Sequence, residues 1–385
     1  MKLFHIHNNF FNKTSGAYVL FLVFISYTAC NAQQSPSSIS DLKVPEGFKI
    51  EVFAENVENA RQMALSPKGI LFVGTRSKGK VYAVVDSDHD YKADKIYTIA
   101  EKMNMPNGVA FKGGALYVAE VNKIWRFDDM ENNLEHPKPP VLITDNYPTD
   151  GHHGWKYIAF GPDGKLYVPV GAPCNICNNE RKNPIYATIT RINPDGSGRE
   201  IVAKGIRNSV GFTWHPETGN LWFTDNGRDM LGDDIPPCEL NELTEKGQHF
   251  GYPYMHGSDI WDPEFGKEGM ARASEFKKPV QNLGPHVAPL GLIFYTGNQF
   301  PEEYKNQILI AEHGSWNRSK KIGYRITMVT FKDGKATSYK PLVTGWLHND
   351  ERVTGRPVAL LQLPDGSVLI SDDYSGKIYR LSYIK

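Results

Sequence analysis

One pattern recurs six times between residue 44 and the C-terminus: an apolar run, a tight turn, a second apolar run and a polar break. Turns such as 162–164 and 364–366 read Pro-Asp-Gly, and Asp-Gly supplies the positive φ angles that a tight hairpin needs. The copies start roughly 45 to 80 residues apart, which is typical of radially repeated sheets. The repeat predicts an all-β fold, a six-bladed β-propeller of four-stranded antiparallel blades, with a β-sandwich or a solenoid of hairpins as the alternative. The copies begin at Met63, Gly108, Ile158, Gly211, Gly291 and Val358.

The composition agrees with many short strands and excludes some partners. The 385 residues include 35 Gly and 25 Pro, and 12% are aromatic, which favours strands and turns over a helical bundle. The 43 basic and 43 acidic residues give a formal net charge of zero, whereas nucleic acids and acidic membranes select a basic excess. We therefore expect no nucleic-acid partner, and a membrane association only through a lipid anchor.

The first 32 residues are predicted to be a signal peptide. Lys2 and Lys13 precede an apolar run at 17–29, which is shorter than a typical membrane-spanning helix. Cleavage after Ala32 gives a secreted protein, and cleavage before Cys30 gives a lipoprotein with a lipidated Cys30. Both outcomes predict a periplasmic or cell-surface protein.

Two further segments complete the domain organisation. Residues 33–43 are predicted to be a flexible tether, because they begin with a polar Gln-Gln-Ser-Pro-Ser-Ser stretch. Residues 44–385 are the predicted propeller domain. The long stretch 225–290 is expected to form loops on the face where propellers usually place their sites.

Polar residues cluster directly before the first strand of several copies. In a propeller these segments converge on the central axis, where Arg, Asn and His together suit an anionic, hydrogen-bonding ligand. A histidine there could also act as a general base or bind a metal, although a His pair is more often structural or merely exposed. The clusters are His152-His153, Arg207-Asn208, 285–289 with His286, 313–318 with Arg318, and Gly355-Arg356.

Two acidic loops are candidates for calcium. Residues 224–229 and 232–241 combine carboxylates with Gly-rich backbone, which is how Ca²⁺ is held, although a solvated turn would look the same. Residues 86–94 open with Asp-x-Asp-x-Asp, but Tyr91 and Tyr97 replace the Gly and Glu of an EF-hand. That loop is either a partial calcium site or an acidic hairpin tip.

Cys174 and Cys177 form a C-x-x-C motif. Asn178 follows it, which argues against covalent haem attachment, and no βαβ context suggests a thioredoxin-like site. In an oxidising compartment a local disulfide is the expected outcome, with Cys238 left unpaired or serving as an alternative partner.

Taken together, these motifs resemble those of the pyrroloquinoline quinone (PQQ)-dependent soluble aldose dehydrogenases, and more closely the L-sorbosone dehydrogenase-like branch. The resemblance extends from about residue 44 to the C-terminus and implies PQQ and Ca²⁺ as cofactors. It rests on His152-His153 before the 161–164 turn, Arg207-Asn208, 225–228 with 232–237, 249–253, 313–318 and 355–357.

The resemblance implies a role for each matching residue. His153 corresponds to the general base that takes the proton of the sugar hydroxyl while hydride passes to the quinone. In glucose-oxidising members an Asp orients this base, and here the position is Ala172, so that Asp150 or His152 would have to substitute. The remaining implied residues are Arg207, Asn208, Arg356, His286 and Arg318 for PQQ, and the backbone carbonyls of Gly227 and Arg228 for Ca²⁺.

The expected function is therefore oxidation of an aldose, a sorbosone-like or a related sugar, with an unidentified electron acceptor. Two alternatives stay open: a non-catalytic lipid-anchored propeller that binds a glycan or a protein, and a calcium-dependent sugar lactonase. The side chains at the axis distinguish the three. A cationic pocket with a flat slot favours PQQ, a carboxylate and Asn cage favours a lactonase, and a pocket filled by Trp or Tyr favours binding alone.

Overall fold

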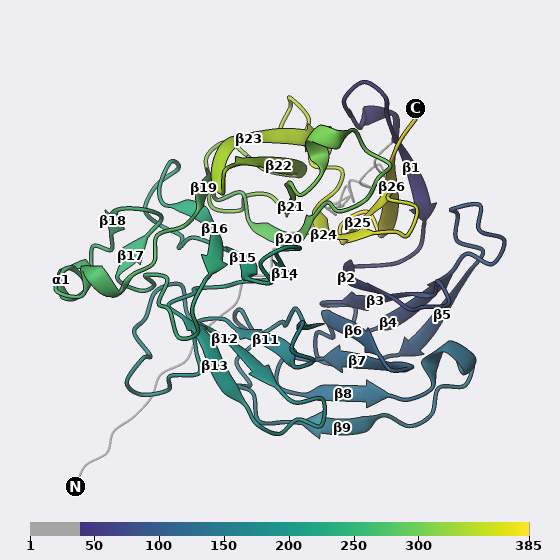
Figure 1. Ribbon diagram of the computed structural model, residues 1–385, viewed down its shortest axis with the longest axis horizontal. Helices are drawn as coiled ribbons and strands as arrows, with labels where there is room; N and C mark the ends of the chain where they lie inside the picture. The colour runs from purple at the N-terminus through teal and green to yellow at the C-terminus, as the bar shows by residue number, and fades with distance from the viewer. Residues whose placement is uncertain (1–38, 385) are drawn as a thin grey trace, which may run out of the picture. The chain divides into compact units, whose positions relative to one another are not determined.

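The computed structural model describes residues 39–384, which form six four-stranded antiparallel sheets arranged in a ring (Figure 1). The predicted six-bladed β-propeller is thereby confirmed. The predicted signal peptide, Cys30 and the first part of the predicted tether lie outside the described residues. Within the described part of the chain, no helix is both long and apolar enough to cross a membrane.

Each blade runs from an inner strand near the axis to an outer strand at the rim. The first three blades are β2 (Ala60–Leu65), β3 (Leu71–Thr75), β4 (Val81–Val85) and β5 (Lys95–Ala100); β6 (Gly108–Lys112), β7 (Ala115–Ala119), β8 (Ile124–Phe127) and β9 (Val141–Thr144); and β10 (Ala159–Phe160), β11 (Leu166–Val170), β12 (Thr188–Ile192) and β13 (Glu200–Lys204). The last three are β14 (Phe212–Trp214), β15 (Leu221–Asp225), β16 (Pro237–Leu243) and β19 (Gln281–Pro285); β20 (Pro289–Phe294), β21 (Ile308–Glu312), β22 (Arg325–Lys332) and β23 (Lys335–Val343); and β24 (Pro357–Gln362), β25 (Val368–Asp372), β26 (Lys377–Tyr383) and β1 (Phe48–Ala54).

The six repeat copies of the sequence are the two inner strands of the six blades. The second strand of every blade is buried along its whole length, because a neighbouring blade covers each of its faces. This explains why these strands are apolar without strict alternation. At the axis the inner strands approach closely, and a Cβ on Gly211 would collide with the Leu290 carbonyl of the next blade.

The ring is closed by its two chain ends. β1 pairs with β26, with Phe48 opposite Tyr383, so the first strand completes the last blade. Residues just before β1 are also docked: Ile39–Asp41 form the 3-10 helix η1, Leu42 is buried, and Lys43 pairs with Thr344. Residues 39–43, which belong to the segment predicted to be a tether, therefore pack against the ring.

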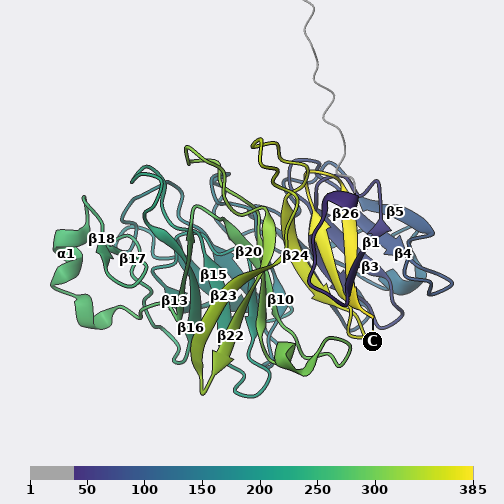
Figure 2. The same ribbon diagram turned by 90° about the horizontal axis from the view of Figure 1, so that it is seen from above.

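The stretch 225–290 differs from the predicted set of loops. It contributes two blade strands, β16 and β19, and between them an insertion with β17 (Met255–His256), β18 (Ile260–Trp261), α1 (Gly266–Met270) and the 3-10 helix η3 (Ala273–Glu275). The insertion projects outside the ring (Figures 1 and 2). Elsewhere the 3-10 helices η2 (Met130–Asn132) and η4 (Glu302–Tyr304) lie in loops.

The acidic loop 86–94 is the exposed tip of the β4–β5 hairpin. The carboxylates of Asp86, Asp88 and Asp94 lie within 4.8 Å of one another. They accept hydrogen bonds from the loop itself: Asp86 from the Tyr91 N–H at 3.0 Å, and Asp94 from the Ser87 N–H at 2.7 Å. These bonds account for the fold of an acidic hairpin tip.

Candidate functional site

A cavity of about 560 Å³ opens at the centre of the ring, on the face where the chain enters each inner strand. Five of the six blades contribute to its wall, as expected for a propeller site. The lining residues that the argument uses are Arg61, Arg76, His152, His153, Trp155, Arg207, Asn208, Asn226, Gly227, Asp229, His286, His313, Trp316 and Arg356.

His153 lies in this wall with its ring held in one tautomer. Its Nδ1–H donates to the Ala172 carbonyl at 2.9 Å, so Nε2 keeps its lone pair. Burial and the nearby Arg207 charge hold the pKa of His153 well below its ordinary value, so the ring is neutral at pH 7. Gly171 makes room for it, since a Cβ there would lie 2.6 Å from the His153 Cβ. His153 is thus a neutral base with its acceptor nitrogen free.

Residue 172 is Ala, and its backbone carbonyl takes over the orienting role expected of an Asp side chain. The Ala172 carbonyl takes the hydrogen bond that the family's carboxylate would take. Neither suggested substitute orients Nδ1: Asp150 is exposed and bonded to the Tyr186 hydroxyl, and His152 stacks beside His153 with 4.0 Å between ring centroids. A carbonyl fixes the same tautomer as a carboxylate but stabilises the imidazolium less.

Arg207 is buried and has all five of its N–H donors engaged. Nε and Nη2 bond the backbone and side-chain oxygens of Asn175, both at 2.8 Å. Nη1 bonds the carbonyls of Asn226 at 3.2 Å and Gly227 at 3.0 Å, and Nη2 also pairs with Asp229 at 3.1 Å. Its guanidinium therefore acts on the cavity through its charge.

Asp225 holds the backbone of Arg207 and Asn208 by two hydrogen bonds. Its carboxylate accepts the N–H of Arg207 at 2.8 Å and of Asn208 at 2.7 Å. Glu239 lies nearby, and burial together with the Asp225 charge raises the pKa of Glu239. Burial raises the pKa of Asp225 as well, to about 7, so both carboxyl groups titrate far above the range of exposed carboxyl groups.

Two arginines of the cavity have no carboxylate partner within residues 39–384. Arg76 stacks on the Trp155 ring, 3.9 Å from its centroid, and burial and Arg61 lower the pKa of Arg76. Arg356 donates only to the carbonyls of His313 at 3.2 Å and Gly314 at 3.3 Å. By contrast, Arg61 is neutralised by Asp373 at 2.7 Å. The wall therefore carries uncompensated positive charge.

Asn208 adds an unpartnered polar group. It is 6% exposed, and its side-chain amide has no hydrogen-bond partner in the described part of the chain, although it faces the cavity. Its amide is therefore available to a ligand in the cavity, as both donor and acceptor. With the two free arginines and the flat Trp155 face, the wall fits a planar, polyanionic ligand with carbonyl groups.

The backbone carbonyls of Gly227 and Arg228, which are predicted to bind calcium, lie at or next to this cavity wall. Gly227 lines the cavity, and its oxygen accepts one bond, from Arg207, of the two that a carbonyl can accept. No hydrogen bond to the Arg228 carbonyl occurs among the described residues, and the Asp229 carboxylate lies beside them. These hard oxygens suit Ca²⁺ in kind.

Not all predicted site residues meet in the cavity. The structure brings together His153, Arg207, Asn208, Gly227, His286 and Arg356. Arg318 instead bonds the Asp233 carbonyl and pairs with Asp234 at 3.0 Å, and the Arg228 side chain pairs with Asp262 at 2.5 Å. Arg318 therefore holds the 232–234 loop and is not among the lining residues of the cavity, and its contact with a cofactor stays a prediction.

Sequence reasoning missed Arg61, Arg76 and Trp155. Arg61 has a signal that could have found it, because it enters the first inner strand as Arg207 and Arg356 enter theirs. Arg76 directly follows the second strand of its blade, at the place that Asn226 and His313 occupy in theirs, so the repeat also offered a signal for Arg76. The predicted local disulfide between Cys174 and Cys177 is confirmed, and Cys238 is a free, buried thiol whose pKa burial raises to about 12.

Comparisons with known proteins cover nearly the whole chain. A family model described as TrAA12-like matches residues 42–383. An uncharacterized protein of Borreliella burgdorferi is 38% identical over 359 residues, which are 90% of this chain and 92% of that protein. The pyrroloquinoline quinone-dependent pyranose dehydrogenase of Coprinopsis cinerea is 22% identical over 92% of this chain, which spans only 56% of that relative.

Two solved structures share the fold. The PQQ domain of the Coprinopsis enzyme in its holo form aligns with a TM-score of 0.72 and 19% identity, over 89% of this chain and 97% of that domain. A Trichoderma reesei protein of the Carbohydrate-Active Enzymes family AA12, in a calcium structure, aligns with a TM-score of 0.76 and 20% identity, over 89% and 97%.

Proposed function

Because the chain belongs to the TrAA12-like family, we propose that it is a PQQ-dependent oxidoreductase of sugars. The observation that carries the proposal is the cavity wall: two arginines without carboxylate partners and one amide without a hydrogen-bond partner, all among the described residues, line the same cavity as a neutral His153. The pyranose dehydrogenase among its relatives, which is PQQ-dependent by name, supports the same assignment.

The residues present fit PQQ, a planar molecule with three carboxylates and an ortho-quinone. Arg76 and Arg356 offer guanidinium donors to carboxylates, Asn208 offers an amide to a carbonyl, and Trp155 offers a flat wall. The bound quinone would supply the two-electron acceptor. The Arg207 charge would add to the positive field in which a quinone becomes a better acceptor.

His153 would perform the proton transfer. Its Nε2 is the free acceptor nitrogen and faces the space where a sugar hydroxyl would have to lie. Removing that proton as hydride leaves the same carbon oxidises the alcohol to a carbonyl. The exposed Trp316 at the rim, 70% exposed, offers an apolar face for the sugar.

The proposal includes a calcium ion bound by Gly227, Arg228 and Asp229. Their oxygens would hold the ion, which would add positive charge beside the quinone carbonyls. We expect chelation with EDTA to weaken PQQ binding, and Ca²⁺ to restore it, as measured by equilibrium titration. Affinity unchanged by chelation would remove calcium from the proposal and leave the rest intact.

The sorbosone-like substrate and the export of the protein are finer proposals. The first rests on the motif resemblance alone. The second is supported by the Cys174–Cys177 disulfide, since such bonds form in oxidising compartments. A lactonase is disfavoured, because Asp229 is the one carboxylate that lines the described cavity, whereas a cage of several carboxylates and Asn is expected at a lactonase site.

A dye-linked assay tests the proposal. Apo-protein is incubated with PQQ and Ca²⁺, and reduction of an artificial electron acceptor is followed with a panel of aldoses, sorbosone and sugar lactones. We expect turnover with at least one aldose or sorbosone, only after PQQ is added. Hydrolysis of a lactone without PQQ would instead establish the lactonase.

A further inference from the structure

The loop between β11 and β12 contacts His153 through Ala172 and Arg207 through Asn175. The backbone oxygen of Asn175 accepts a hydrogen bond from Arg207 Nε, and its side-chain oxygen accepts one from Arg207 Nη2, each at 2.8 Å. The same amide also bonds Asp229 twice: Oδ1 accepts the Asp229 N–H at 2.9 Å, and Nδ2 donates to the Asp229 carbonyl at 3.1 Å. One side chain therefore fixes two charged residues of the cavity.

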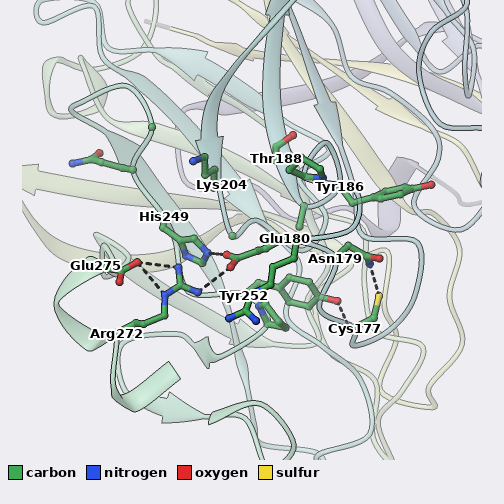
Figure 3. A pocket seen from close by; sticks show the side chains of 17 residues that line it. Cys177, Asn179, Glu180, Tyr186, Thr188, Lys204, His249, Tyr252, Arg272 and Glu275 are labelled. Carbon is green, nitrogen blue, oxygen red and sulfur yellow. Dashed lines mark hydrogen bonds and ion pairs between the residues drawn. The ribbon is translucent and has the colours of Figure 1, made fainter. Parts of the chain in front are cut away.

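The disulfide between Cys174 and Cys177 closes the backbone around Asn175. The closed loop is held from outside as well, because the Cys177 N–H donates to the Tyr252 hydroxyl at 3.0 Å (Figure 3). At its start, the Ala172 N–H donates to the Arg207 carbonyl at 2.8 Å. Asn175 thus has little freedom to leave Arg207.

The far end of the loop is pinned by Glu180. Its carboxylate pairs with His249 and, at 2.9 Å, with Arg272 (Figure 3). It also accepts a hydrogen bond from the Tyr254 hydroxyl at 3.0 Å. Burial opposes ionisation, yet His249 and Arg272 lower the pKa of Glu180 to about 2. Glu180, His249, Arg272 and Glu275 line a cavity of about 380 Å³ and pair with one another there, which holds this part of the loop in place.

We propose that Asn175, held inside the Cys174–Cys177 disulfide, is a positioning residue that fixes Arg207 and Asp229 for cofactor binding. This inference rests on the proposed function. The same loop contains Ala172, whose carbonyl orients His153. One short segment therefore positions both the His153 base and the Arg207 guanidinium. Breaking the disulfide would release Asn175 and weaken the site without touching a residue of its wall.

Asn175→Ala tests the inference, with Asn178→Ala as the matched control. Asn178 lies in the same loop but bonds the Tyr254 hydroxyl, away from the cavity. We expect Asn175→Ala to weaken PQQ binding about tenfold or more, since bonds to a charged group are lost. Asn175→Asp keeps the acceptor for Arg207 and should recover most of the affinity, whereas Asn178→Ala should retain it.

A second readout separates this inference from the proposed function. Hydrogen exchange of the apo-protein should be faster at the Asp229 amide in Asn175→Ala, with or without any cofactor. Faster exchange in a protein whose wild type fails to bind PQQ would overturn the proposed function and keep the positioning role.

The disulfide is tested by Cys174→Ser with Cys177→Ser. We expect this variant to lose PQQ affinity as Asn175→Ala does, and the combined variant to lose no more than either alone, because both act through the same contact. Unchanged exchange at Asp229 and unchanged PQQ affinity in Asn175→Ala would overturn the inference. Additive losses in the combined variant would overturn the part assigned to the disulfide.

Discussion

At the scale of single residues, the site is defined by which polar groups are satisfied and which are not. Arg207 and Arg61 are paired with carboxylates, whereas Arg76, Arg356 and the Asn208 amide keep unmet hydrogen-bonding capacity beside the cavity. Two of these three groups are cationic, so together they suit an anionic ligand.

His153 sets the acid limit of activity. Because burial and Arg207 hold its pKa well below 6.5, the base is neutral throughout the physiological range. We expect kcat/KM for the sugar, measured at saturating PQQ, to stay level from about pH 8 down to about pH 6.5 and to fall only below that, as the ring protonates. An acid limb centred above about pH 6.5 would show that His153 is not the titrating base.

Arg76 is expected to contribute to PQQ binding and not to the stability of the apo-protein. Arg76→Met should raise the PQQ dissociation constant about 10- to 100-fold, the equivalent of a lost charged hydrogen bond. Burial and repulsion by Arg61 already lower its pKa, so the apo-protein should be no less stable to urea. Arg352→Met, which removes a half-exposed arginine outside the cavity, should change neither quantity. Full PQQ affinity in Arg76→Met would remove Arg76 from the site.

At the scale of elements, local pattern predicted the hairpins but could not predict their partners. The Asp-Gly turns and apolar runs lie at the observed inner strands, because such turns are encoded by adjacent residues. The pairing of β1 with β26 and the bonds from Asn175 to Arg207 join residues far apart in sequence. Neither leaves a local signal. For the same reason, the sequence predicts loops over the whole stretch 225–290, where the structure has β16, β19 and the insertion between them.

Closure of the ring by β1 depends on Phe48. Its ring lies against Phe300 at 4.8 Å and Tyr383 at 5.0 Å between centroids, and only 9% of it is exposed. We expect Phe48→Ala to cost about 3 to 5 kcal/mol in the free energy of unfolding, measured by urea denaturation. The exposed neighbour offers a control, since Lys49→Ala should stay within about 0.5 kcal/mol. A small effect of Phe48→Ala would mean that β1 does not close the ring.

At the scale of the whole molecule, a ligand in the central cavity would join five blades. Binding to the folded state alone raises the free energy of unfolding by about 2.7 kcal/mol when PQQ is present at 100 times its dissociation constant. We therefore expect PQQ to raise the melting temperature of the wild type in a concentration-dependent way. Arg76→Met should need correspondingly more PQQ, and a melting temperature independent of PQQ would contradict binding to the native ring.

The repeat count predicted the number of blades because each copy is a complete hairpin with its own turn. The site was predicted less completely. Residues before inner strands, such as Arg207 and Arg356, follow the repeat and could be placed at the axis. Arg76 and Trp155 meet only after folding, and the paired state of Arg207 depends on Asn175 from another loop. Contacts of this kind are set by tertiary packing.

The most direct test of the account is an equilibrium titration of apo-protein with PQQ in the presence of Ca²⁺, followed by quinone absorbance, for the wild type and His153→Ala. We predict that both proteins bind PQQ with similar affinity, because His153 is assigned to the proton and not to the cofactor. Only the wild type should then reduce a dye when sugar is added. Failure of the wild type to bind PQQ at any accessible concentration would contradict the account.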